Sequence, residues 1–223
     1  MQKAMSLEAV LFDLDGTLID TAPDMAYALN LLLEENQRAP LAFEAIRPYV
    51  SDGSLALVRL GFADLNDAQQ EQLKNRYLEL YEANLHVYSC LFEGMDKVLE
   101  TIEQQGLKWG VITNKPAFLT NALLKSMQLD TRASCIVSGD TTAQRKPHPE
   151  PMLYACEQAQ VKAQNCIYVG DAERDIQAGN NTQMYTIIAN YGYISERETP
   201  DTWHANATIK RASELLNTLK ECS

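Results

Sequence analysis

The sequence predicts an α/β protein: a doubly wound parallel sheet with a small helical domain inserted near its N-terminal end. Three observations carry this prediction. Strand-sized apolar segments alternate with helical stretches, one long interval shows only helical patterns, and acidic residues follow two of the apolar segments. The 223 residues, 46% hydrophobic and 22% charged, have an ordinary globular composition, which excludes a disordered or collagen-like chain.

Several apolar segments have the length of buried strands. They are 8–14, 108–113, 134–139, 166–170 and 184–188. Helical stretches at 94–105, 116–127 and 149–160 lie between them. Because parallel strands need crossover connections and helices then cover both faces of the sheet, this alternation predicts a doubly wound parallel sheet.

The interval from residue 19 to about 88 shows only helical periodicity and is too long for a simple crossover. Its helical stretches are 22–35, 43–50, 55–60 and 69–85. We therefore expect a discontinuous core, formed by 1–19 and 88–223, and an inserted helical domain formed by 20–87. Linkers near 19–22 and 87–92 would join the two.

Charge and composition exclude several classes of partner. The net charge of −11 argues against nucleic acid, since no basic stripe is there to offset phosphate repulsion. The apolar segments are far shorter than the ~20 residues that span a bilayer, and residues 1–6 lack the apolar region of a signal peptide. The 5 cysteines are scattered without a C-x-x-C pair, which predicts reduced thiols. We expect a cytoplasmic protein, monomeric or homodimeric, without a membrane partner.

Two pairs of acids follow predicted strands, at the sheet edge where open α/β proteins bind ligands. Asp13 and Asp15 follow the first strand, and Asp171 and Asp175 follow the strand at 166–170. Alternation along a strand places the first pair on one side, and their repulsion favours a hard cation such as Mg²⁺. Together the pairs would form an acidic bowl that needs a metal. The alternative for each pair is local: turn formation, or capping of a helix.

Groups that bind anions occur at two further places. Thr113 and Asn114 end the second strand and offer a hydroxyl and a backbone N–H. Lys146 lies in the proline-stiffened loop 145–149, which would hold its side chain with little loss of entropy. Taken alone each signal is weak, because a lysine usually lies in solvent.

These motifs, in this order and spacing, resemble the haloacid dehalogenase (HAD) superfamily. They are an apolar strand before Asp-x-Asp-Gly-Thr, a strand ending in Thr-Asn, a Lys-Pro pair, and Gly-Asp-x-x-x-Asp, and they extend from Asp13 to Asp175. The inserted helices resemble the superfamily's cap domain of the type placed between the first and second motifs. The resemblance implies a Rossmann-like core with this cap.

The resemblance also implies roles for the acids. Asp13 would be the nucleophile that forms an aspartyl phosphate, and Asp15 the general acid and base. Mg²⁺ would be held by Asp13, the main-chain carbonyl of Asp15, and Asp171. Asp175 would orient Lys146 or a metal-bound water from outside the ligand set. A carboxylate at position 15 implies phosphomonoester hydrolysis or phosphomutase chemistry.

The remaining motifs would bind the phosphate. Thr113 and the Asn114 backbone would contact phosphate oxygens, and Lys146 would neutralise charge between nucleophile and phosphate. One departure from the usual pattern is Glu173-Arg174, where small or polar residues are frequent. We expect it to leave the metal ligands undisturbed.

Over nearly its whole length the chain resembles phosphoglycolate phosphatases, in segments 20–24, 91–95 and 110–116. A closer resemblance is to N-acetylmuramic acid 6-phosphate phosphatases. It rests on segments 86–95, 107–111 and 191–194, with Pro200 and Trp203 downstream. Both resemblances imply a small phosphate ester that carries a carboxylate, and the sequence does not separate the two substrates.

The candidate specificity loop is 47–54, between two of the predicted cap helices. Gly53 and Ser51 permit close approach to a ligand, and Arg47 offers a planar fork to a substrate carboxylate. The alternative is that Arg47 pairs with a helical neighbour such as Glu44.

Two other classes of function stay open. A sugar phosphomutase of the β-phosphoglucomutase type shares all of these motifs. A receiver-like phospho-acceptor signalling domain also groups acids, threonine and lysine at strand ends. The helical insert and the Asp13/Asp15 pair on one strand count against the receiver.

Overall fold

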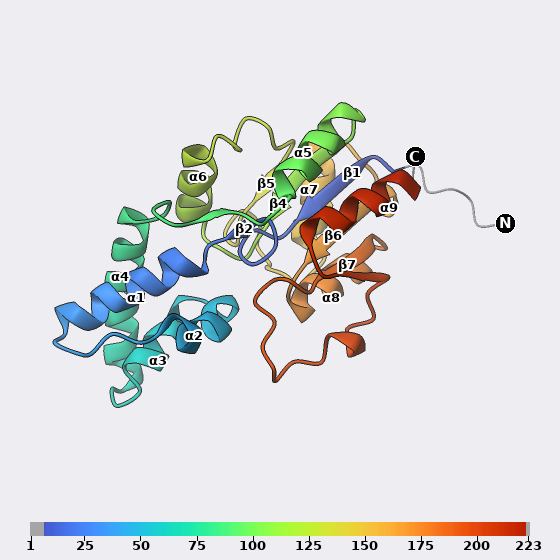
Figure 1. Ribbon diagram of the computed structural model, residues 1–223. Coiled ribbons are helices and arrows are strands. Elements are labelled where there is room, and N and C mark those ends of the chain that lie inside the picture. The colour runs from blue at the N-terminus through green and yellow to red at the C-terminus, as the bar shows by residue number, and fades with distance from the viewer. Residues whose placement is uncertain (1–6, 222–223) are drawn as a thin grey trace.

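The computed structural model describes residues 7–221, and its central feature is a sheet of six parallel strands (Figure 1). The expectations for residues 1–6 and for Cys222 lie outside this range. The strand order is β5-β4-β1-β6-β7-β8. The strands are β1 (Ala9–Phe12), β4 (Lys108–Ile112), β5 (Ile136–Val137), β6 (Cys166–Gly170), β7 (Tyr185–Ala189) and β8 (Ala207–Ile209). The predicted α/β fold class is confirmed.

The strands differ from the prediction mainly at the two sheet edges. The edge strand β8 was not predicted, because three residues are too few to show a strand pattern. At the other edge, β5 has two residues where the apolar pattern indicated 134–139. The pattern is more informative for the central strands, which are buried along their length.

Helices cover both faces of the sheet, as a doubly wound fold requires. One face packs α5 (Met95–Gln104), α6 (Ala117–Ser126) and α9 (Leu215–Glu221) against Val10 and Phe12. The opposite face packs α7 (Glu150–Ala159) and α8 (Glu173–Asn181) against Ala9 and Leu11. Alternate residues of β1 thus enter different cores, because successive side chains of a strand point to opposite faces. Short 3-10 turns connect some elements: η2 (Ala163–Asn165), η3 (Pro200–Thr202) and η4 (Ala212–Glu214).

The predicted insert is a helical lobe beside the sheet (Figure 1). Its elements are α1 (Ala22–Glu35), α2 (Phe43–Ile46), the 3-10 helix η1 (Arg47–Asp52), α3 (Ser54–Gly61) and α4 (Asp67–Ala83). Most of a second hydrophobic cluster lies in this lobe, where Leu29, Leu57 and Tyr77 are fully buried, and Leu119 and Tyr193 of the core join it. We propose that this lobe is the cap domain expected for 20–87, and we call it the cap below.

Local chemistry explains two departures among the cap helices. The helix expected over 43–50 becomes a 3-10 helix at Arg47, because Pro48 lacks the N–H that an α-helix uses. Helix α4 begins two residues before the expected start, since Asn66 caps it. The Asn66 side chain accepts from the Gln69 backbone, and the Gln69 side chain accepts from the Asn66 N–H.

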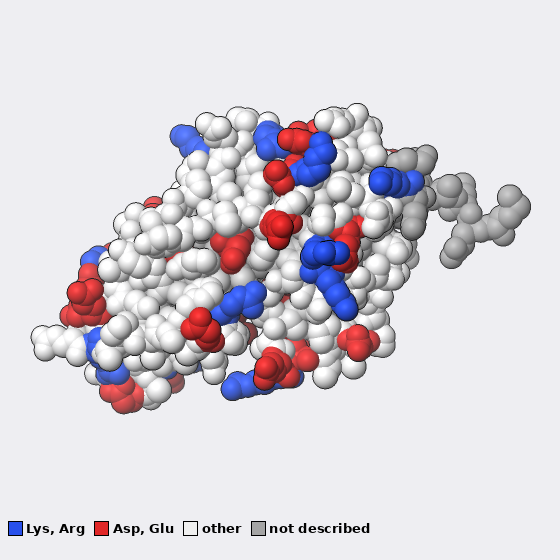
Figure 2. Space-filling model, viewed as in Figure 1, with Lys and Arg blue, Asp and Glu red and all other residues white. Residues whose placement is uncertain are grey.

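The two connections between core and cap pair with each other. β2 (Ile19–Asp20) and β3 (Cys90–Leu91) form a two-stranded antiparallel ribbon where the sequence indicated linkers. Among the described residues, no helix is long and apolar enough to cross a membrane. On the face that Figure 2 presents, lysines and arginines are dispersed among the acids and form no continuous basic stripe.

Candidate active site

The site lies at the carboxyl ends of the central strands. In the sheet, Phe12 of β1 pairs with Val111 of β4 and with Val169 of β6. Asp13 therefore leaves the sheet between its two neighbours, and its backbone N–H still donates to the Val169 carbonyl at 2.9 Å. Thr113 follows β4 and Asp171 follows β6, so parallel pairing brings these residues together from distant parts of the sequence.

Three buried acids form a cluster at this edge. Oxygen atoms of Asp13, Asp171 and Asp175 all lie within 4.8 Å of one another. The Asp171 carboxylate also accepts from the Tyr193 backbone N–H at 2.8 Å and from the Thr17 hydroxyl at 3.1 Å. The loop after β1 passes very close, since a Cβ at Gly16 would lie 2.1 Å from Asp171 Oδ2. A side chain at position 16 would thus displace this carboxylate.

Lys146 is the cation that contacts this cluster. Its side chain is 1% exposed, and its ammonium lies 2.8 Å from Asp13 Oδ1 and 2.7 Å from Asp175 Oδ1. It also donates to the Ile112 carbonyl and to the Tyr168 hydroxyl. These contacts fix the ammonium beside Asp13.

The Asn114 side chain holds the backbone of this lysine. Asn114 Oδ1 accepts from the Lys146 N–H at 3.0 Å, and Asn114 Nδ2 donates to the Lys146 carbonyl at 3.1 Å. The sequence indicated a role for the Asn114 backbone, and the structure adds this role for its side chain. Two hydrogen bonds therefore link the Thr-Asn motif at the end of β4 to the Lys-Pro loop.

Burial makes the cluster electrostatically unfavourable in its fully ionised form. Burial, with the charges of Asp13 and Asp175, raises the pKa of Asp171 to about 8. Burial and the charge of Asp175 likewise raise the pKa of Asp13 to about 6. Burial disfavours the charge on Lys146, but the neighbouring Asp13 and Asp175 outweigh it and raise its pKa. The Lys146 ammonium contacts only Asp13 and Asp175. Even with the charge of Arg174, which favours the ionised form of Asp13, the three carboxylates outnumber the two cations.

This donor set fits a hard divalent cation. Three buried carboxylates within 4.8 Å supply the oxygen ligands that Mg²⁺ prefers, and its charge would offset their repulsion. Asp13 and Asp171 are the members of the predicted ligand set whose side chains lie here. Asp175 has other partners, because it pairs with Lys146 and its Oδ2 accepts from the Ala172 N–H at 3.0 Å. The prediction assigned only the main-chain carbonyl of Asp15 to the metal, and the Asp15 side chain lies outside the cluster.

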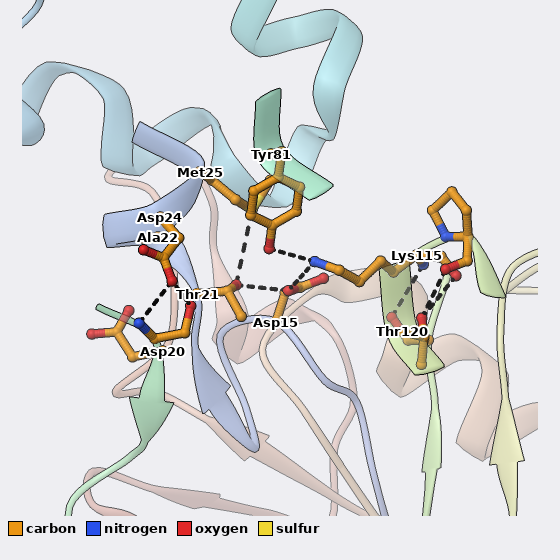
Figure 3. A network of polar contacts seen from close by, with 12 residues as sticks. Asp15, Asp20, Thr21, Ala22, Asp24, Met25, Tyr81, Lys115 and Thr120 are labelled. Atoms are coloured by element: carbon orange, nitrogen blue, oxygen red, sulfur yellow. Dashed lines mark hydrogen bonds and ion pairs between the residues drawn. The ribbon is translucent and has the colours of Figure 1, made fainter. Parts of the chain in front are cut away.

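The Asp15 carboxylate points toward the junction with the cap (Figure 3). Its Oδ1 accepts from the Thr21 hydroxyl at 2.6 Å and from the Lys115 ammonium at 2.9 Å. The sequence reasoning did not single out Lys115. The signal that could have found it is its position, directly after the Thr113-Asn114 pair at a strand end.

A cavity of about 580 Å³ opens above these residues, between core and cap. Asp13, Asp15 and Thr113 contribute to its core side, and Ser51 and Gly53 line its cap side. Gly53 has a left-handed backbone (φ 85°), which suits glycine where the chain turns from η1 into α3. The cations on its wall are Lys74, Lys115, Arg145 and Arg174.

Arg174 is a second residue whose place the sequence reasoning missed. Arg174 lies in the first turn of α8, and its guanidinium donates to the Ser51 carbonyl of the cap at 3.0 Å. The sequence marked it only as a departure from the usual motif. In the structure this core residue bridges to the predicted specificity loop.

Arg47, the candidate reader of a substrate carboxylate, contacts the core in this structure. Arg47 does not line the cavity, and its guanidinium donates to the Gly192 carbonyl at 2.8 Å and lies 5.1 Å from the Tyr193 ring centroid. The alternative pairing with Glu44 is not formed either among the described residues. Arg47 is the first residue of η1 and lies next to the core loop after β7. Its hydrogen bond to that loop connects the cap to the core.

Comparisons with known proteins agree with this geometry. The family model "haloacid dehalogenase-like hydrolase" matches residues 10–189. A phosphoglycolate phosphatase of Xanthomonas campestris pv. campestris is 41% identical over 93% of this chain and 94% of its own length. An N-acetylmuramic acid 6-phosphate phosphatase of Pseudomonas aeruginosa is 34% identical over 97% and 96%. The chain therefore belongs to the haloacid dehalogenase-like hydrolase family and is an enzyme.

Solved structures support the fold. A crystal structure described as a predicted phosphoglycolate phosphatase from Haemophilus somnus superposes with a TM-score of 0.84 at 23% identity, covering 98% of this chain and 100% of that one. The family resemblance seen in the sequence is confirmed, and the curated relatives are phosphatases. The expected closer similarity to N-acetylmuramic acid 6-phosphate phosphatases is not found, since that relative is 34% identical and the relative named phosphoglycolate phosphatase is 41% identical. Membership of an enzyme family removes the receiver-like signalling domain from consideration.

Proposed function

We propose that this phosphatase hydrolyses a small phosphorylated carboxylate or sugar acid, with Mg²⁺ and through an aspartyl phosphate on Asp13. The observation that carries the proposal is the placement of Asp13. Its buried carboxylate contacts the Lys146 ammonium at 2.8 Å, adjoins Asp171, and faces a cavity with further cations on its wall. This setting suits a nucleophile that must approach a phosphate dianion.

In the first step a carboxylate oxygen of Asp13 attacks phosphorus. The new bond joins that oxygen to phosphorus, and the bond between phosphorus and the ester oxygen breaks. Asp15 gives a proton to the departing alkoxide. Lys146 and the Thr113–Asn114 turn stabilise the charge that develops on the phosphoryl oxygens.

In the second step water attacks the phosphorus of the aspartyl phosphate. Asp15, now ionised, takes a proton from that water, and the bond from phosphorus to Asp13 breaks. Phosphate leaves, and both carboxylates return to their starting state. Two successive displacements thus need one residue that serves as acid and then as base.

Asp13, Asp171 and the Asp15 carbonyl would hold Mg²⁺, which supplies positive charge that lets an anionic nucleophile approach an anionic ester. The excess of buried carboxylates over lysine supports this assignment. Asp175 keeps Lys146 in place and caps helix α8, so it supports the site without joining the reaction.

The cavity favours the bulkier of the two candidate substrates. About 580 Å³ is within the range of pockets that take drug-sized ligands, and a two-carbon phosphoester would leave most of it to water. Lys74 on the cap and Arg145 on the core offer charge to a carboxylate beyond the phosphate. We therefore place N-acetylmuramic acid 6-phosphate ahead of 2-phosphoglycolate.

The test is phosphate release from 2-phosphoglycolate, N-acetylmuramic acid 6-phosphate and glucose 1-phosphate, with Mg²⁺ and then with EDTA. We expect the sugar acid ester to have the highest kcat/KM, and all turnover to disappear in EDTA. Conversion of glucose 1-phosphate to its 6-phosphate isomer would establish the phosphomutase alternative instead. Full turnover in EDTA would refute the metal assignment.

We also propose that the enzyme works in the cytoplasm. Cys90, Cys135, Cys156 and Cys166 are all free thiols, and the last three are buried, which suits a reducing compartment. Activity that is unaffected by strong reductant is the expected result.

A further inference from the structure

Lys115 is a buried lysine that none of the proposed chemical steps uses. It is 8% exposed, and its backbone is anchored in the core. Its N–H donates to the Thr113 hydroxyl at 3.2 Å, and its carbonyl accepts from the Gly139 N–H at 2.9 Å. The start of its side chain is thus as fixed as the phosphate-binding turn beside it.

The ammonium of Lys115 joins the core to the cap (Figure 3). It donates to Asp15 Oδ1 at 2.9 Å and to the Tyr81 hydroxyl at 2.7 Å, and it lies 4.5 Å from the centroid of the Tyr81 ring. Asp15 belongs to the loop after β1, whereas Tyr81 belongs to α4 of the cap. A single side chain therefore connects the proposed acid and base to the cap.

Tyr81 is held firmly within the cap. It is 1% exposed and stacks on Tyr77, with ring centroids 6.1 Å apart. The Tyr77 hydroxyl donates in turn to the Met25 carbonyl of α1 at 3.2 Å. Because α1 and α4 pack against each other, these contacts fix Tyr81 relative to the rest of the cap.

The second donor to Asp15 also comes from the cap boundary. Thr21 immediately precedes α1, and its hydroxyl lies 2.6 Å from Asp15 Oδ1. Its backbone N–H and that of Ala22 donate to the Tyr193 hydroxyl at 2.7 and 2.8 Å. Both groups that hold the Asp15 carboxylate thus sit where core and cap meet.

We propose that Lys115 is a positioning residue for Asp15, and that Tyr81 of the cap sets the position of Lys115. The seating of the cap then determines where the proton donor lies relative to the ester oxygen. This inference rests on the proposed function, in which Asp15 is the acid and base.

The geometry gives a physical reason for this coupling. An ammonium has three N–H donors, and two of them have acceptors here on opposite sides of the boundary. A carboxylate held by one hydroxyl alone can rotate, whereas a second, charged donor restricts it to one orientation. Loss of the ammonium should therefore misplace the proton without removing it.

Lys115→Met tests the proposal, since it removes the ammonium and keeps an unbranched apolar side chain. The readouts are kcat and KM for N-acetylmuramic acid 6-phosphate or 2-phosphoglycolate, whichever the wild type hydrolyses faster, and for 2,4-dinitrophenyl phosphate. The sugar or glycolate alkoxide needs a proton to leave, and dinitrophenolate does not. We expect kcat/KM to fall ~10- to 100-fold for the alkyl ester and by less than about threefold for the aryl ester.

The aryl ester should also show a distinctive change in kcat. Hydrolysis of the aspartyl phosphate still needs Asp15 as the base, so kcat should fall for both esters. With the aryl ester, KM should fall together with kcat and leave their ratio nearly unchanged. A purely structural role for Lys115 would not produce this pattern.

Tyr81→Phe and Lys97→Met provide the second variant and the control. Tyr81→Phe removes only the hydroxyl. It should lower kcat/KM for the alkyl ester by about three- to tenfold, in the same direction as Lys115→Met. It also carries the test if Lys115→Met does not fold. Lys97 pairs with Glu100 on the exposed surface of α5, and its replacement should leave kcat and KM unchanged for both esters.

A double variant separates action through Asp15 from direct contact with substrate. If Lys115 acts through Asp15, Asp15→Asn/Lys115→Met should be no slower than Asp15→Asn within about threefold. If the rate losses of the two single variants multiply in the double variant, Lys115 acts independently of Asp15 and the proposal is overturned. Equal losses of kcat/KM on both esters in Lys115→Met, with a raised KM, would assign Lys115 to substrate binding and also overturn it. Failure of the proposed function itself would appear elsewhere, as turnover that survives Asp13→Asn.

Discussion

Asp13 and Asp15 each contact a buried lysine, and the two lysines differ in their other partners. Lys146 contacts Asp13 at 2.8 Å, and its other partners come from the core. Lys115 contacts Asp15 at 2.9 Å, and its other partner is Tyr81 of the cap. The Asp13 side chain is 7% exposed and that of Asp15 is 19% exposed.

This difference suggests a division of labour. The proposed nucleophile, Asp13, needs a fixed and dry position, and the carboxyl ends of β1, β4 and β6 supply it. The acid and base must serve a departing alkoxide and later a water molecule, so its surroundings have to admit and exclude solvent in turn. Contact with a separate helical lobe, through Tyr81, is suited to that task.

Replacement of the nucleophile should have the largest effect. Asp13→Asn keeps the side-chain volume and removes the attacking charge, so phosphate release should fall by roughly 10⁴-fold or more. The circular dichroism spectrum should be unchanged, because β1 is held by its ladder and not by this carboxylate. A variant within tenfold of wild-type turnover would contradict the role of Asp13.

Replacement of Lys146 should separate the two pairs most clearly. Lys146→Met should lower kcat/KM by ~10²- to 10³-fold for alkyl and aryl esters alike, because charge neutralisation at phosphorus is needed whatever the leaving group. It leaves buried carboxylates without their cation, so the free energy of unfolding in urea should drop by about 3 kcal/mol. A loss of kcat/KM confined to alkyl esters, as expected for Lys115→Met, would contradict the different roles given to Lys146 and Lys115.

The metal-free enzyme should lose stability as pH rises. Asp171 has an ordinary pKa of 3.8 and a folded pKa raised to about 8, and Asp13 is raised to about 6. A carboxyl with a raised folded pKa favours folding when protonated, so its contribution is fully present below pH ~4 and is lost as pH rises through the folded value. The melting temperature in EDTA should therefore fall between pH 5 and pH 8.5, and Asp171→Asn should flatten this slope.

Magnesium should reverse that loss. Binding requires ionised carboxylates and stabilises the folded state, so Mg²⁺ should raise the melting temperature more at pH 8 than at pH 5.5. An equal increase at both pH values would place the bound metal away from Asp13 and Asp171.

The smallest effect should come from Arg47. Its hydrogen bond to the Gly192 carbonyl fastens the cap, so Arg47→Ala should lower the free energy of unfolding by about 1 kcal/mol. Its kcat/KM should change by less than about threefold, equally for carboxylate-bearing and aryl esters. A larger loss confined to carboxylate-bearing esters would restore Arg47 as the group that reads the substrate.

Much of the fold and the catalytic edge could be predicted, because the information is local. The central strands are buried apolar runs, and Asp13, Thr113 and Asp171 follow them directly in the sequence. Once parallel pairing is assumed, those residues must meet at one edge. The strand β8 was not predicted, because its three residues are too few to show a strand pattern.

The cap side of the site could not be predicted in the same way. Whether Arg47 points to the cavity or to the Gly192 carbonyl depends on how the cap packs, and no local pattern records that packing. The same holds for Lys115 and Tyr81, which lie on separate elements and meet only through the seating of the cap. Long-range contacts of single side chains are what sequence patterns omit.

The most direct test of the account is a search for the aspartyl phosphate. Asp15→Asn, incubated with Mg²⁺ and 2,4-dinitrophenyl phosphate, keeps the nucleophile and Lys146 but lacks the base that activates water. Mass spectrometry should find one phosphoryl group per chain, located by peptide mapping at Asp13 and absent from the Asp13→Asn/Asp15→Asn variant. Phosphate release without any phosphoenzyme, or a phosphoryl group on another residue, would contradict the central claim.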